Sequence, residues 1–241
     1  MQNGFYVSLS GQRALSRRLE TIADNVANMN TVGFRASGVS FAAELGKTGA
    51  AQAAFASTGV DYVSRRAGAL VRTDNELDVA IQGDGWFSVM TSTGPAYTRD
   101  GRMHISESGT LETLNGLKVL DAGGSNLLLN PQGGPPVITA DGMITQGGRQ
   151  VGAIGLFSID ENAKLTRTMN SAVYTDRPAK PVLDFTQNRI VQGWIEQSNV
   201  SPVQEMTKLI TVTRNFDGLA AGMAEMDSST QDAIKVLGGQ S

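Results

Sequence analysis

Two long helices with narrow apolar faces are predicted at the ends of this chain, and they constrain its fold more than any other feature. In the first, expected from about residue 3 to 30, apolar residues recur on one heptad frame: Phe5, Leu15, Leu19, Ile22, Val26 and Met29. The last helix, expected to end near Leu237, repeats this pattern with Met206, Leu209, Phe216, Ala220, Met223, Ile234 and Leu237. Its start is indicated by Ser201 as N-cap, Pro202 at the first helical position and Gln204 completing a capping box.

Neither apolar face has a partner nearby in the sequence. A buried apolar side chain contributes roughly 1.5–3 kcal/mol, so a helix face left in water forfeits on the order of 10 kcal/mol. A helix with an apolar stripe usually packs on its own domain. Here both helices are terminal and use heptad spacing, so we expect them to pair with each other or with other copies of the chain. Such a coiled-coil-like α domain would carry subunit assembly.

The middle of the chain predicts a different structure, with a period of two. Leu77, Val79 and Ile81 alternate with polar or small residues, as a strand with one buried face requires. Asp-Gly at 100–101 and Asn-Gly at 115–116 predict hairpin turns, because both residues of such turns adopt positive φ. The middle therefore reads as mostly antiparallel β structure.

The predicted fold class is α+β, with three regions. Residues 1–35 and 198–241 are expected to form the helical assembly domain, and residues 73–197 the β-rich outer domain. Residues 36–72 are rich in Ala, Gly, Ser and Thr and are interpreted as an extended connector.

Composition excludes several classes of function. A formal net charge of -3 gives no basic field for nucleic acid. No basic residue precedes an apolar run at the N-terminus, so we expect no cleaved signal peptide, and no apolar stretch approaches the roughly 18 residues needed for membrane insertion. The chain has no cysteine, which removes disulfides and thiolate ligands.

No catalytic, metal-binding or cofactor-binding pattern is visible. The single histidine, His104, lies between Met103 and Ile105 in an alternating strand and is expected to be exposed. Aspartates beside glycines, such as Asp84 and Asp100, are more typical of turns than of calcium sites. We therefore expect no enzyme and no cofactor. A glycan-active enzyme with paired carboxylates in the β region stays open as an alternative.

Four motifs, in order along the chain, resemble those of the bacterial flagellar rod and hook family. The first runs from Ala23 to Arg35 and reads ADNVANMNTVGFR. The others are LDVAIQGDGWF from Leu77 to Phe87, YTRDG from Tyr97 to Gly101, and GWIEQSNV from Gly193 to Val200. Short length and the Arg214-Asn215-Phe216-Asp217 sequence are more similar to a proximal rod subunit than to the longer distal rod and hook proteins.

The resemblance implies a structural subunit of the flagellar basal-body rod that polymerises through its terminal helices. It would be exported unfolded by the flagellar type III apparatus and would assemble in the periplasmic space with other copies of itself and other rod proteins. Assembly residues would include the heptad positions above and the motif residues Asn25, Asn28, Asn30, Thr31, Gly33, Phe34, Ser198, Asn199 and Val200. A distal rod protein and a secreted β-rich binding module are the alternatives.

Overall fold

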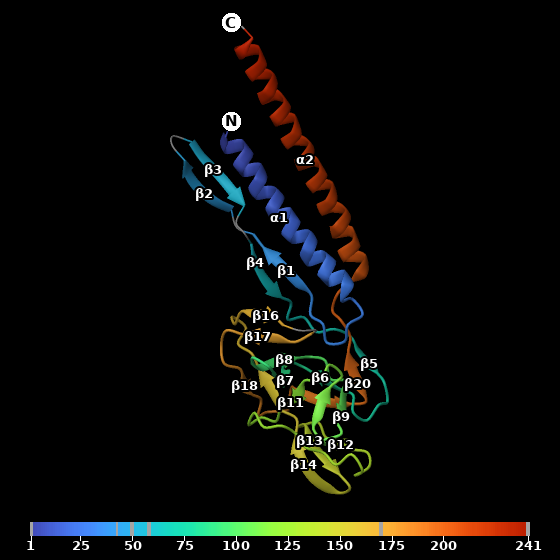
Figure 1. Cartoon of the computed structure of the whole chain (residues 1–241). Helices are drawn as coiled ribbons and strands as arrows, with labels where there is room; N and C mark the ends of the chain where they lie inside the picture. The colour runs from blue at the N-terminus through green and yellow to red at the C-terminus, as the bar shows by residue number, and fades with distance from the viewer. Residues whose placement is uncertain (1, 42, 49–50, 57–58, 169–170, 240–241) are drawn as a thin grey trace. The chain divides into compact units, whose positions relative to one another are not determined.

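The computed structural model describes residues 2–41, 43–48, 51–56, 59–168 and 171–239, with side chains described at fewer positions. Two helices, one near each end, flank a β region whose strand pairings are antiparallel. The predicted α+β class is therefore confirmed (Figure 1).

The chain divides into two compact units. The helical unit comprises Met1–Ala27, Ser37–Tyr62 and Ser201–Ser241, and the β unit comprises Asn28–Ala36 and Val63–Val200. These boundaries differ from the predicted ones, because residues 36–72 are shared between the two units and carry five strands. Small residues do not prevent pairing, since the hydrogen bonds of a β ladder are made by the backbone.

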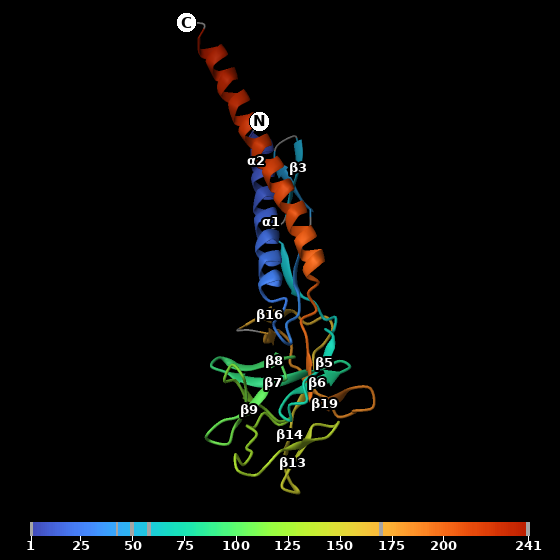
Figure 2. The ribbon, with the colours of Figure 1, turned by 90° about the vertical axis from the view of Figure 1, so that its right-hand side faces the viewer.

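Two antiparallel helices form the main part of the helical unit. α1 spans Gln2–Ala27 and α2 spans Pro202–Gly238, and they lie side by side in both views (Figures 1 and 2). The predicted start of α2 is confirmed, with Ser201 in extended conformation at the N-cap and proline in the first turn. Ser201 makes no side-chain capping hydrogen bond, so the expected capping box is not formed.

Two pairs of strands complete the helical unit. β1 (Ser37–Ser40) pairs with β4 (Val60–Val63), and β2 (Ala43–Thr48) pairs with β3 (Ala51–Ala56). Of these strands, β1 and β3 pack against α1.

The β unit is built around a nine-stranded sheet. Its main path runs β16-β17-β8-β7-β11-β10-β9, with β15 also pairing β7 and β18 pairing β15. A three-stranded sheet, β12-β13-β14, and the pairs β19-β6 and β20-β5 complete it. The strands are β5 Leu70–Arg72, β6 Val79–Gln82, β7 Trp86–Thr91, β8 Gly94–Thr98, β9 Met103–Ile105, β10 Leu111–Thr113, β11 Lys118–Val119, β12 Val137–Ile138, β13 Met143–Gln146, β14 Arg149–Ala153, β15 Leu156–Ser158, β16 Leu165–Arg167, β17 Val173–Thr175, β18 Lys180–Pro181, β19 Arg189–Gln192 and β20 Trp194–Glu196.

The main core of the β unit gathers apolar side chains from most of these strands. Val79, Ile81, Phe87 and Val89 are among its fully buried members. Strand β6 departs from the predicted alternation, because Ala80 is buried as well as its two neighbours. β6 pairs with β19 and also contacts β20, which leaves no solvent-facing side at Ala80.

Candidate functional site

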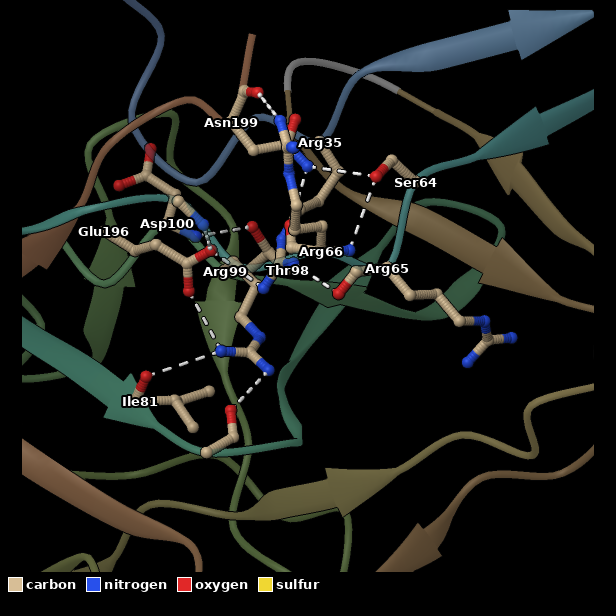
Figure 3. A network of polar contacts seen from close by, with 12 residues as sticks. Arg35, Ser64, Arg65, Arg66, Ile81, Thr98, Arg99, Asp100, Glu196 and Asn199 are labelled. Atoms are coloured by element: carbon tan, nitrogen blue, oxygen red, sulfur yellow. Dashed lines mark hydrogen bonds and ion pairs between the residues drawn. The ribbon is translucent and has the colours of Figure 1, made fainter.

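The four motifs, far apart in the sequence, meet in the β unit around one buried carboxylate. Glu196 comes from β20, Arg35 from the loop that follows α1, and Arg99 from the segment after β8 (Figure 3). We call these three residues the ion-pair node. Their side chains are between 1% and 3% exposed, so the charges are removed from water.

Glu196 divides its two oxygens between the two arginines. Arg35 Nη2 lies 2.8 Å from Oε1, and Arg99 Nη1 donates to Oε2 at 2.9 Å. The backbone N–H of Gly68 also donates to Oε1, at 3.0 Å. Buried ions are tolerated when they are paired and hydrogen-bonded, and this carboxylate meets both conditions.

The guanidinium groups have further partners beyond Glu196. Arg35 Nη1 donates to the carbonyl of Arg65 at 2.6 Å, and Arg99 Nη2 donates to that of Gly83 at 3.0 Å. Both groups also lie 5.6 Å from the ring centroid of Trp86, within the range of a cation–π interaction. The Trp86 ring therefore packs beside both guanidinium groups and interacts favourably with their positive charge.

The node contains two cations and one anion, which affects the arginines. Burial, and next the charge of Arg99, lowers the pKa of Arg35 to about 10, while the charge of Glu196 opposes this shift. Burial likewise lowers the pKa of Arg99, again opposed by Glu196. Arg35 remains charged at neutral pH, and it depends on Glu196 as a counter-ion.

Backbone hydrogen bonds join the first and the last of the four motifs directly. Gly33 N–H donates to the carbonyl of Glu196 at 2.7 Å, and Asn199 N–H donates to that of Phe34 at 3.2 Å. The Asn199 side chain accepts from Ala36 N–H at 2.6 Å and donates to the Arg66 carbonyl at 2.6 Å. Inside the β unit, the segment that leaves α1 is therefore fixed beside the segment that enters α2.

Phe34, one of the expected assembly residues, is buried inside the β unit. Phe34 is 1% exposed, and the Arg167 guanidinium lies 4.0 Å from its ring centroid. Arg167 also donates to the carbonyl of Arg35. Just before Phe34, Gly33 adopts a φ of +69°, and a Cβ there would lie only 2.2 Å from the Asp100 nitrogen. This combination of left-handed backbone and close approach explains a glycine at this position.

The other predicted residues of the first and last motifs are close in sequence to Gly33, Phe34 and Asn199. Thr31 Oγ1 donates to Asn28 Oδ1 at 3.1 Å, which closes the turn after α1. Met29 and Ser198 are half-buried, Val200 is buried, and Asn30 is exposed. All of these belong to the β unit.

The helical unit holds the remaining predicted residues. On α1, Ile22 and Asn25 are buried, and Leu15, Leu19 and Val26 are half-buried. On α2, Leu209, Phe216 and Met223 are half-buried. The side chain of Phe5 lies outside the described residues.

The buried face of α2 differs from the predicted heptad face, which includes Met206. Glu205 and Val212 are buried, at 5% and 3% exposure, whereas Met206 is 51% exposed. Glu205 is buried instead of its neighbour Met206 because its carboxylate has hydrogen-bond partners there. The Asn25 amide donates to this carboxylate at 3.2 Å, and Lys208 Nζ donates to it at 2.6 Å. A polar residue can occupy a helix interface when its partners satisfy it.

The described residues show no arrangement suited to catalysis or metal binding. Among them, no three His, Asp or Glu side chains lie close enough to share a metal ion. His104 is half-buried in β9 opposite Glu112, rather than exposed as expected. No helix in this part of the chain has the length and hydropathy needed to cross a membrane.

Comparisons with known proteins indicate the same family that the four motifs resemble. Residues 5–35 match the family model described as flagella basal body rod protein, and residues 80–151 match that of the flagellar hook protein FlgE/F/G D1 domain. Residues 191–236 match the flagellar basal body rod FlgEFG protein C-terminal model.

Full-length relatives carry the same description. The chain is 48% identical over 241 residues to the flagellar basal-body rod protein FlgF of Mesorhizobium japonicum, with 100% of both chains covered. It is 46% identical to FlgF of Rhizobium meliloti, with 99% of both covered, and 28% identical to FlgG of Bacillus subtilis, with 98% of this chain and 99% of that one covered. The chain therefore belongs to the family of flagellar basal-body rod proteins, and it is FlgF-like. This is a family of structural proteins and not a class of enzymes, so the chain is a structural rod subunit.

The residues of the ion-pair node were not among the predicted site residues, although all three stand inside the quoted motifs. The available signal was a charged side chain directly beside large apolar residues. Arg35 follows a phenylalanine, and Glu196 follows Trp194 and Ile195 in a short strand. Such placements indicate a buried ion pair, because a lone buried charge is too costly.

Proposed function

We propose that this subunit polymerises through its terminal helices and occupies the proximal part of the rod. One observation carries the proposal: Val203, Met206 and Ile210 on α2 are 76%, 51% and 56% exposed. Their spacing of three and four residues places them on one side of the helix. That side is distinct from the one formed by the buried residues Glu205 and Val212.

An exposed apolar stripe of this kind favours a partner helix. Each of its side chains would contribute about 1.5–3 kcal/mol on full burial. Contiguous exposed apolar surface on a soluble protein marks an interaction site. In a rod, the neighbours that could cover the stripe are other copies of the chain and other rod proteins.

The proximal position is supported by the graded similarity within the family. Three proteins named FlgF are 48%, 46% and 35% identical to this chain, against 28–29% for proteins named FlgG. Two other proteins named FlgF are 27–28% identical, so the support comes from the first three. Export through the flagellar type III apparatus into the periplasmic space is part of the same proposal. A chain without cysteine forms no disulfide that would hinder threading in an unfolded state.

A Met206→Asp substitution tests the assembly role. We expect it to abolish or strongly reduce swimming, because a carboxylate in an apolar interface costs several kcal/mol. The isolated protein should keep its fold, since Met206 is half in solvent already. Swimming in soft agar and the amount of the protein in purified basal bodies are the measurements.

Gln204→Asp is the matched control. Gln204 is exposed on the same turn of α2 but lies off the stripe, so this variant should swim like the parent strain. Normal swimming and normal incorporation of the Met206→Asp protein would refute assembly through this face.

A further inference from the structure

Asn25 makes an unusual set of contacts near the end of α1. The side chain is 2% exposed, and its amide oxygen accepts from the backbone N–H of Ser37 at 2.8 Å. Its amide nitrogen donates to the carbonyl of the same residue at 2.9 Å and to Glu205 Oε2 at 3.2 Å. The amide thus uses its oxygen and both of its N–H groups. Turning it over would place the oxygen against a carbonyl and a carboxylate, so its orientation is fixed.

Glu205 completes the contact from α2. It is 5% exposed, and its second oxygen, Oε1, accepts from Lys208 Nζ at 2.6 Å. The carboxylate also belongs to the first turn of α2, where the helix dipole favours negative charge. Both members of the Asn25–Glu205 pair are therefore buried and satisfied only when α1 and α2 are aligned as they are here.

A second contact shows that this alignment holds along the helices. Leu219 Cδ1 lies 3.5 Å from the position that a Cβ of Gly11 would occupy. Gly11 precedes Asn25 by 14 residues, and Leu219 follows Glu205 by 14 residues. The two contacts are two heptads apart on each helix and define one antiparallel register.

The apolar residues alone do not specify this register. Leu209, Phe216 and Met223 repeat at intervals of seven, so a shift of α2 by one heptad still places apolar side chains against apolar side chains. The same shift would bring Val212 opposite Asn25 and move Glu205 past the end of α1 at Ala27, so the buried Asn25 amide would lose its carboxylate partner. An unsatisfied buried polar group is costly, so the shifted pairing is disfavoured.

We infer that the buried Asn25–Glu205 pair sets the register in which α1 and α2 of this chain pair, as a specificity-determining contact between two otherwise repetitive helix faces. A single buried polar residue fixes alignment in coiled coils by the same principle. The pair also ties the start of β1 to this register through Ser37. The inference concerns pairing within one chain and holds whether or not the helices mediate polymerisation.

Cysteine crosslinking of the full-length protein tests the register directly, because the chain contains no cysteine of its own. Leu219→Cys combined with Gly11→Cys reports the observed register. Leu219→Cys combined with Arg18→Cys reports a shift of one heptad. In the otherwise unchanged protein, we expect the first combination to crosslink at least tenfold more than the second at a short oxidation time.

In an Asn25→Leu, Glu205→Leu background, the shifted combination should rise to within about twofold of the native one. Lys208→Ala, which retains both members of the pair, should leave the native preference unchanged. A shifted yield that stays at its original low level in the double variant would overturn the inference. If the double variant loses helix content by circular dichroism, Glu205→Leu alone, which keeps the Asn25 contacts to Ser37, carries the same expectation and the same refutation.

Discussion

A Glu196→Ala variant is expected to lose about 3–5 kcal/mol in the free energy of unfolding of the β unit, the range seen when one partner of a buried ion pair is removed. Arg35 and Arg99 meet this carboxylate at 2.8 and 2.9 Å, and all three side chains are almost fully buried. Without Glu196, two buried guanidinium groups would face each other. The Gly68 N–H would lose its acceptor as well.

Tryptophan fluorescence during denaturation by urea measures this effect selectively. The chain has two tryptophans, Trp86 and Trp194, and both belong to the β unit. Trp86 contacts both arginines of the node, so its emission reports the environment that the substitution changes.

Arg177→Ala serves as the control because it breaks an ion pair of the same unit that is about half exposed. Exposed pairs contribute about 0–1 kcal/mol. If Glu196→Ala is no more destabilising than Arg177→Ala, the node does not hold the β unit together.

A Gly33→Ala variant is expected to be destabilised by about 2–5 kcal/mol, combining the cost of a left-handed alanine with the cost of overpacking. Gly33 has a φ of +69°, and an added Cβ would lie 2.2 Å from the nitrogen of Asp100 and 2.5 Å from the carbonyl carbon of Arg99. Those atoms are backbone and cannot move aside like a side chain.

Gly116→Ala separates the two costs in the same fluorescence experiment. Gly116 has a nearly identical φ of +75°, but nothing lies within 4 Å of its added Cβ. We expect this control to lose only about 1–2 kcal/mol. Equal losses in the two variants would show that the close approach to Asp100 is unimportant.

The sequence predicted the helices of this fold well, because helices have local signals. Its hairpin predictions were only partly right: β10 pairs with β11 across Asn115-Gly116, but β8 and β9, on either side of Asp100-Gly101, pair with other strands. Neither Asp100 nor Asn115 has the positive φ that was expected. Heptad spacing predicted both terminal helices, and Ser201 with Pro202 marked the start of α2. It predicted less well which face of α2 meets α1. Met206 and Glu205 are adjacent, and hydrophobicity favours Met206, but the contacts of Glu205 with Asn25 and Lys208 reverse the choice.

The ion-pair node could not be assembled from the sequence, because its members are brought together only by the fold. Arg99 and Glu196 are separated by 97 residues. The motifs contained both residues, but periodicity describes neighbours along a chain and carries no information about such distant pairs. The close approach of Asp100 to Gly33 could not be predicted from the sequence for the same reason.

Imaging of basal bodies tests most directly that this chain is a structural subunit of the rod. Basal bodies would be purified from a strain that lacks the gene and from the same strain with the gene restored, and compared by electron cryo-microscopy. We expect the deletion to remove part of the rod and the restored gene to return it. A complete rod in the deletion strain would contradict the structural role.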